Sequence, residues 1–70
     1  MPIVEIEILD GVFDEDQKRE MILKVTEAMV EVEGEAMRDK TWVRTKTIPS
    51  GQFAIGGHIM DPGSVRQAAE

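Results

Sequence analysis

The sequence predicts an α+β protein: a β-α-β unit followed by a C-terminal β-hairpin, with one helix packed on one face of two parallel strands. Residues 3–9 and 41–48 alternate with a period of two, and an apolar period of 3.6 residues runs between them from residue 14 to residue 34. A strand-helix-strand order favours a right-handed crossover between parallel strands. We expect one domain, residues 1–70, in which residues 61–70 form a candidate flexible tail.

The composition limits the class of function. The net charge of -6, from 14 acidic and 8 basic residues, opposes nucleic-acid binding, which relies on clustered cations. No apolar run reaches membrane-spanning length, so no membrane partner is expected. The chain has no cysteine and one histidine, which argues against a metal site or cofactor and fits a cytoplasmic location.

The first strand has two different faces. One face is purely aliphatic and should meet the helix, whereas the other mixes carboxylates with aliphatic side chains. These faces are Val4, Ile6 and Ile8 on one side, and Ile3, Glu5, Glu7 and Leu9 on the other.

The helix has clear start and stop signals. Asp14 and Gln17 have the spacing of a capping box, and Gly34 is suited to the helix end. The apolar stripe expected to face the sheet consists of Met21, Ile22, Val25, Ala28, Met29 and Val32. Residues 35–39 should form a polar connection.

The second strand repeats the two-faced pattern. Thr41, Val43, Thr45 and Thr47 alternate with Trp42, Arg44, Lys46 and Ile48. The cations share the face that carries the carboxylates of the first strand, so opposite charges can pair there. Residues 52–60 then resemble a hairpin with a Gly-Gly turn. Two strands and one helix leave this charged face bare, which predicts an oligomer with the face as its interface.

Four motifs resemble the 4-oxalocrotonate tautomerase family, part of the tautomerase superfamily with an amino-terminal proline. Proline follows the initiator Met, and the first strand ends in Ile-Leu-Asp-Gly. The helix start at residues 14–18 is similar to the family's Asp-Glu-Gln-Lys. Residues 51–57 are close to the family's Gly-x-Phe-Gly-Ile-Gly-Gly. The match covers residues 2 to about 59, with the motifs in the family's order and spacing.

The resemblance implies a hexamer in which the amine of Pro2, freed by removal of Met1, is the general base. The reaction implied is tautomerisation of a small enol or keto unsaturated carboxylate, without metal or cofactor. Phe53 matches the family's active-site phenylalanine and would form an apolar wall; its other interpretation is packing of the hairpin on the sheet. The amine must be neutral to act as a base, and apolar walls or nearby cations favour that form.

The sequence departs from the family where two arginines bind a dicarboxylate substrate. Those positions hold Val12 and Trp42. Three explanations are open. Arg44 can replace the missing cation, unless it pairs with Glu5 or Glu7. A different subunit of a heterohexamer can supply the arginines. The substrate can be smaller or less charged, with Trp42 lining an apolar pocket.

Two other functions fit the same resemblance. The chain can be a non-catalytic structural subunit of a heterohexamer. It can also be a dehalogenase or hydratase, which would need a protonated Pro2 and a carboxylate to activate water. The sequence selects no particular carboxylate for that role, and His58 matches no catalytic position of the family.

Overall fold

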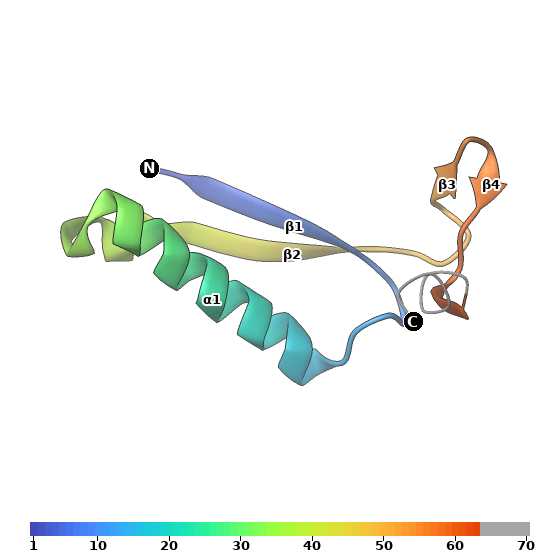
Figure 1. The fold of residues 1–70 in the computed structure, drawn as a ribbon, viewed down its shortest axis with the longest axis horizontal. Helices are drawn as coiled ribbons and strands as arrows, with labels where there is room; N and C mark the ends of the chain where they lie inside the picture. The colour runs from blue at the N-terminus through green and yellow to red at the C-terminus, as the bar shows by residue number, and fades with distance from the viewer. Residues whose placement is uncertain (64–70) are drawn as a thin grey trace.

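The computed structural model describes residues 1–63, and its centre is a two-stranded parallel sheet. Strand β1 (Ile3–Leu9) pairs with β2 (Trp42–Ile48) in a register that sets Ile3 against Trp42 and Leu9 against Ile48. Both strands therefore begin at one end of the sheet and finish at the other (Figure 1). The predicted α+β class, with parallel strands, is confirmed. Most of the predicted tail, residues 64–70, lies outside the described residues.

Helix α1 (Glu15–Glu33) returns the chain to the starting end of the sheet, as parallel pairing requires. Its capping box is formed: the Gln17 amide donates to Asp14 Oδ1 over 2.8 Å, and the Asp14 amide donates to Gln17 Oε1 over 3.0 Å. Gly34 ends the helix with a φ of 102°, where a side chain would be strained. The predicted helix limits are confirmed.

Most of the predicted apolar stripe of α1 is confirmed, because four of its six residues, Met21, Ile22, Val25 and Met29, are half-buried. Ala28 is exposed and Val32 is 87% exposed, although both were predicted to face the sheet. Each residue turns a helix by about 100°, so these two residues lie on one flank of the stripe. Val30 is buried on the opposite flank, where it lines a depression with Gly34 and Glu35. The half-buried side of α1 also includes three polar residues, Lys18, Thr26 and Glu33.

A short 3₁₀ helix, η1 (Glu35–Lys40), joins α1 to β2, where a polar connection was predicted. After β2, the strands β3 (Ala54–Ile55) and β4 (His58–Ile59) form an antiparallel hairpin around Gly56-Gly57. The Met60 amide extends the hairpin by donating to the Phe53 carbonyl over 2.8 Å. The hairpin lies beyond the finishing end of β1 and β2, away from the N-terminus (Figure 1).

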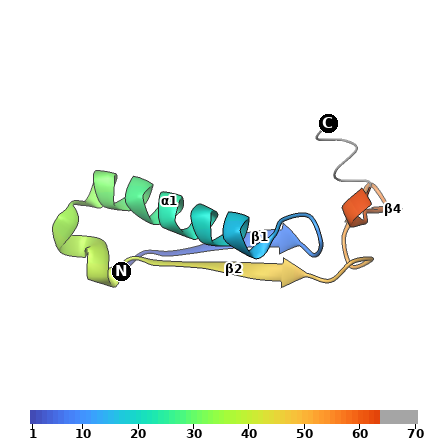
Figure 2. The same cartoon turned by 90° about the horizontal axis from the view of Figure 1, so that it is seen from below.

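One face of the sheet is covered by α1, and no other described element covers the opposite face (Figure 2). We call this the uncovered face; its side chains are Ile3, Glu5, Glu7, Leu9, Trp42, Arg44, Lys46 and Ile48. Among the described residues Ile8 and Val30 are the only buried hydrophobic side chains, and they remain 3% and 4% exposed. The radius of gyration is 14.7 Å, against about 11 Å expected for a compact domain of this length. The isolated chain is therefore extended and has little core of its own.

None of the described helices is long and apolar enough to cross a membrane.

Val30 and Val32 differ in burial, so their replacement by alanine should change the free energy of unfolding by different amounts. V30A removes a buried side chain and should lower the free energy of unfolding by about 2 kcal/mol through lost burial and a residual cavity. V32A is the matched control and should change it by less than about 0.5 kcal/mol, because Val32 is exposed. Urea denaturation at equal protein concentration measures both, and equal losses would contradict the observed orientation of α1.

Candidate active site

Pro2 lies at the starting end of the sheet, where its backbone is fixed by β2. The Trp42 amide donates to the Pro2 carbonyl over 3.1 Å. Extending the parallel register by one residue places Pro2 opposite Thr41. Pro2 is half-buried, and Met1 ahead of it is 69% exposed.

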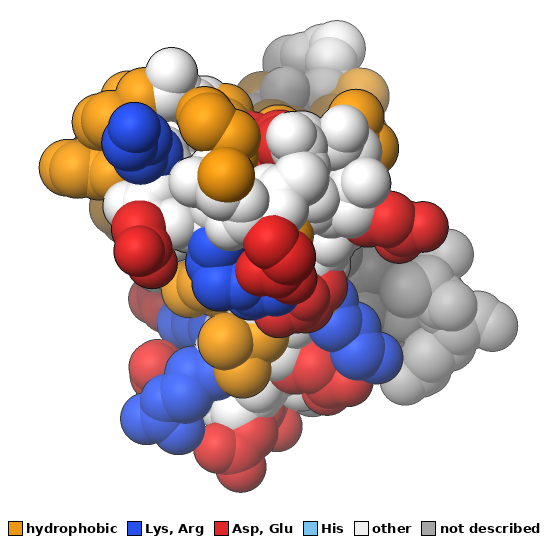
Figure 3. Space-filling view, turned by 90° about the vertical axis from the view of Figure 1, so that its left-hand side faces the viewer, with side chains coloured by type: hydrophobic (Ala, Val, Ile, Leu, Met, Phe, Trp, Pro, Cys, Tyr) orange, Lys and Arg blue, Asp and Glu red, His pale blue; other side chains and the backbone are white. Residues whose placement is uncertain are grey.

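Trp42 lies at the Pro2 end of the sheet, with its side chain on the uncovered face. It pairs with Ile3 across the ladder, and these side chains are 56% and 60% exposed. An indole and an isoleucine therefore form an apolar patch at this end of the uncovered face. Figure 3 views the molecule from this end: charged side chains cover the lower half, on the side of α1, while hydrophobic side chains gather at the upper left.

Arg44 lies two residues farther along β2 and pairs with a carboxylate of β1. Its Nη2 donates to Glu5 Oε2 over 2.7 Å, and the two residues are ladder partners. This confirms the predicted pairing of charges across the uncovered face. A shallow depression lined by Glu5, Arg44, Thr45 and Lys46 surrounds the pair. No described carboxylate pairs with Lys46, so it leaves an uncompensated positive charge at this depression.

Phe53 lies at the finishing end of the sheet, where it shares a depression with Glu7, Leu9 and Ile48. Strand β1 separates the two ends by about 20 Å, at roughly 3.3 Å per residue. A single chain therefore does not bring Phe53 and Pro2 together. Val12 also follows the finishing end of β1, and its amide donates to the Leu9 carbonyl over 3.4 Å.

Glu33 is a partly buried carboxylate at this end of the sheet that the sequence reasoning missed. Its Oε2 lies 2.5 Å from the Thr41 hydroxyl, which also lies 2.8 Å from the Met37 carbonyl. Its Oε1 is shielded from solvent and has no hydrogen-bond partner among the described residues. A signal was present in the sequence: a carboxylate in the last turn of the helix, where the helix dipole disfavours negative charge and no basic residue compensates it.

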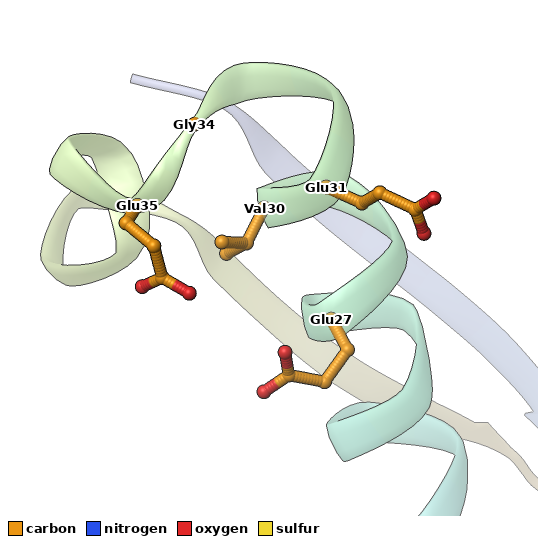
Figure 4. Close-up of a pocket in the computed structure, with 5 residues that line it drawn as sticks. All are labelled: Glu27, Val30, Glu31, Gly34 and Glu35. Carbon is orange, nitrogen blue, oxygen red and sulfur yellow. The ribbon is translucent and has the colours of Figure 1, made fainter.

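A second group of carboxylates lines a depression at the end of α1, formed by Glu27, Val30, Glu31, Gly34 and Glu35 (Figure 4). Arg38 neutralises two of them, donating to Glu27 over 2.7 and 3.0 Å and to Glu35 over 2.9 Å through two nitrogens. No cluster of three or more potential metal ligands was found among residues 1–63. This depression is better explained as a clamp that joins η1 to α1 than as a ligand site.

Known proteins share both the fold and the sequence family. A structure described as one of the 4-oxalocrotonate tautomerase isozymes from Methylibium petroleiphilum matches with a TM-score of 0.71 and 26% identity, covering 99% of this chain and 100% of that one. DmpI from Helicobacter pylori matches with a TM-score of 0.69 and 24% identity, covering 94% and 97% of the two chains, and supports the fold alone. No curated protein sequence matches.

The fold is thus that of small tautomerases, a class of isomerase. The family model described as "Tautomerase enzyme" matches residues 2–61, and the chain belongs to this family. The resemblance to the 4-oxalocrotonate tautomerases is confirmed, and family membership supports an isomerase-type enzyme.

The Arg38 clamp predicts a loss of stability in acid. Hydrogen bonds from Arg38, followed by its charge, hold the pKa of Glu27 below the ordinary value of 4.5, and the hydrogen bond from Arg38 likewise lowers the pKa of Glu35. When folding lowers the pKa of a carboxyl group, its ionised form stabilises the folded state at any pH above the unfolded-state pKa. This stabilisation is lost as the pH falls through the folded-state pKa. The contribution should therefore be complete above about pH 4.5 and fade below it.

R38Q removes the clamp, so the stability gap between wild type and R38Q should narrow as the pH falls below 4.5. Chemical denaturation across the acid range measures the gap. R19Q is a charge-matched control, because Arg19 makes a single exposed contact with Asp16. A gap that stays constant with pH would rule out the clamp as its source.

Proposed function

We propose that the protein is a tautomerase in which the Pro2 amine, after removal of Met1, is the general base. The observation that carries the proposal is the position of Pro2, whose carbonyl accepts a hydrogen bond from the Trp42 amide at the starting end of the sheet, in a chain of the tautomerase family. The neutral amine takes a proton from the enol hydroxyl of a small unsaturated carboxylate and returns it to a carbon of the conjugated system. The reaction moves one proton and two double bonds, and needs no other reactant.

The surroundings of Pro2 favour this role. The reference pKa of an α-amino group is about 8, and Ile3 and Trp42 form an apolar surface that disfavours the protonated amine. We assign Trp42 to the apolar part of the substrate. We assign Arg44 to its carboxylate, with Glu5 fixing the guanidinium and leaving its other nitrogens to bind. One cation and one indole suit a substrate with a single carboxylate better than a dicarboxylate.

We propose that the working form is a hexamer, either of identical chains or of two different subunits. The uncovered face, the extended shape and the two-residue core of the described chain support assembly. Phe53 supports it too, because only a second subunit can bring this ring to Pro2 when one chain holds them at opposite ends. A cytoplasmic location remains a prediction.

Replacing Pro2 tests the proposed base. P2A converts the secondary amine to a less basic primary amine without the ring, and should lower kcat for an enol with a single carboxylate, such as phenylenolpyruvate, by at least about 100-fold. P49A is the control, because it removes a ring whose nitrogen is always an amide. Intact mass must confirm removal of Met1 in each protein. Equal rates for P2A and wild type would end the proposal.

Mixing two inactive variants tests the shared site. P2A and F53A should each be impaired, but a mixture unfolded and refolded together should recover about a quarter of wild-type activity, since half of the sites receive an intact Pro2 and half of those an intact Phe53. Native mass spectrometry reports the mixed assemblies. Mixed assemblies without recovered activity would show that Pro2 and Phe53 do not form a common site between subunits.

A further inference from the structure

One flank of α1 carries an apolar stripe that the sheet covers only in part. Its four members follow one another at intervals of four, three and four residues, which places them in one narrow line along the helix: Met21, Val25, Ala28 and Val32. The first two are half-buried, whereas Ala28 is exposed and Val32 is 87% exposed. This spacing is typical of a helix that packs against a second helix.

The described elements of the chain leave this stripe open. The 3₁₀ helix η1 packs against the other flank of α1, where Arg38 donates to Glu27 and where Val30 and Glu35 line a common depression. The Glu31 side chain, which borders the stripe, points away from Val30 and Glu35 (Figure 4). The two strands lie along a further side of α1 (Figure 2). The stripe is therefore accessible to a second molecule.

The border of the stripe away from the sheet carries one cation and one anion. Lys24 and Glu31 lie seven residues apart, and both are exposed. Lys24 contacts Glu20 over 2.9 Å while its side chain remains 78% exposed. No cation of residues 1–63 forms an ion pair with Glu31. The border is thus able to form further ion pairs.

An antiparallel pair of α1 helices makes this border self-complementary. When a two-fold axis crosses the stripe between Val25 and Ala28, Val25 of each copy packs against Ala28 of the other. The same axis brings Lys24 of each copy to within roughly 3 Å, measured along the helix, of Glu31 of the other copy. Two opposite-charge pairs form, one on either side of the axis. A parallel pair would set every residue level with its own copy, so that like charges adjoin.

We propose that α1 pairs antiparallel with α1 of a second copy of this chain, through the apolar stripe and the Lys24–Glu31 ion pairs at its border. The small side chain of Ala28 lets the helices approach closely where they cross. This contact is separate from the uncovered face, which lies on the opposite side of the sheet, and it does not depend on the role of Pro2. A chain with two different contact surfaces can form a closed assembly larger than a dimer.

Charge reversal tests the pairing without changing the core. K24E and E31K each place like charges at both ends of the contact, and each should weaken the two-fold association by about 10-fold or more. An equimolar mixture of the two should associate like wild type, because every mixed pair regains two opposite-charge contacts. Residues 24 and 31 of one helix lie about 10 Å apart along its axis, so recovery in the mixture can come only from contacts between chains.

R19E is the matched control, because it makes the same change of charge at an exposed position of α1 away from the stripe. A mixture of R19E with E31K has the same net charge as the mixture of K24E with E31K, but should recover nothing. Sedimentation velocity measures the association, and native mass spectrometry counts the mixed assemblies.

A substitution inside the stripe gives a second readout. V32E places a carboxylate in the contact and should halve the mass of the assembly, measured by light scattering. L23E is its control, because Leu23 is also exposed, at 65%, but lies on the other flank of α1. The comparison of V30A with V32A concerns the single chain, so it is made at a protein concentration below the dissociation constant of this contact.

The outcomes separate this contact from the proposed function. V32E with the mass of wild type, or equal recovery in the two charge-reversal mixtures, would overturn the helix pairing. A wild-type chain that stays monomeric at every concentration would also overturn it and assign the stripe to a different partner. An inactive P2A beside V32E of wild-type mass would support the general base and remove only the helix contact.

Discussion

The parallel pairing of β1 with β2 is the constraint on which the rest of the structure depends. Parallel strands start at the same end of a sheet, so α1 must carry the chain back along their length before β2 can begin. Three chain segments therefore meet at one end: the N-terminus, the end of α1 and the start of β2 (Figure 1). Because of this topology Pro2 lies opposite Thr41, which in turn contacts Glu33 at the end of α1.

The same constraint leaves the sheet one-sided. A crossover connection places its helix on one face, and the described chain has no second helix for the other. The pairing of Glu5 with Arg44 makes that face partly self-neutralising, and Ile3, Leu9, Trp42 and Ile48 make it apolar at both ends. Such a face is suited to contact with another subunit at its apolar ends while small molecules reach the polar centre. Under the proposed function, assembly and substrate binding would draw on the same surface, in keeping with the small core of a single chain.

The sequence was sufficient for the class of fold because its signals are local. The alternation of residues 3–9, the Asp14–Gln17 capping box and Gly34 each define an element without reference to distant residues. The burial of Val30 rather than Val32 could not be read in this way: both are apolar, and Val30 lies beside Gly34 and Glu35, where the chain folds back after the helix. The predicted pairing of Arg44 followed from strand parity and was confirmed with Glu5.

The candidate site was less accessible to sequence reasoning. Pro2, Trp42 and Phe53 were found through motifs, but motifs carry no distances, and the separation of Phe53 from Pro2 emerged only from the topology. Glu33 was missed because a glutamate on a charged helix is usually solvated; its shielded oxygen depends on contacts with β2. A tally of helix-end charges would have drawn attention to it, since the last turn of α1 has no basic residue.

The charge on Pro2 links the geometry to the choice of chemistry. A neutral amine beside Ile3 and Trp42 abstracts a proton and isomerises an enol, whereas an ammonium held by a carboxylate donates a proton to carbon and favours addition of water. The apolar patch of Ile3 and Trp42 is more than half exposed in the single chain. A desolvated surface lowers the pKa of an amine only as far as water is excluded. Under the proposed function, closure of the uncovered face by a second subunit would therefore strengthen the apolar effect, and assembly would be part of how the site acquires its base.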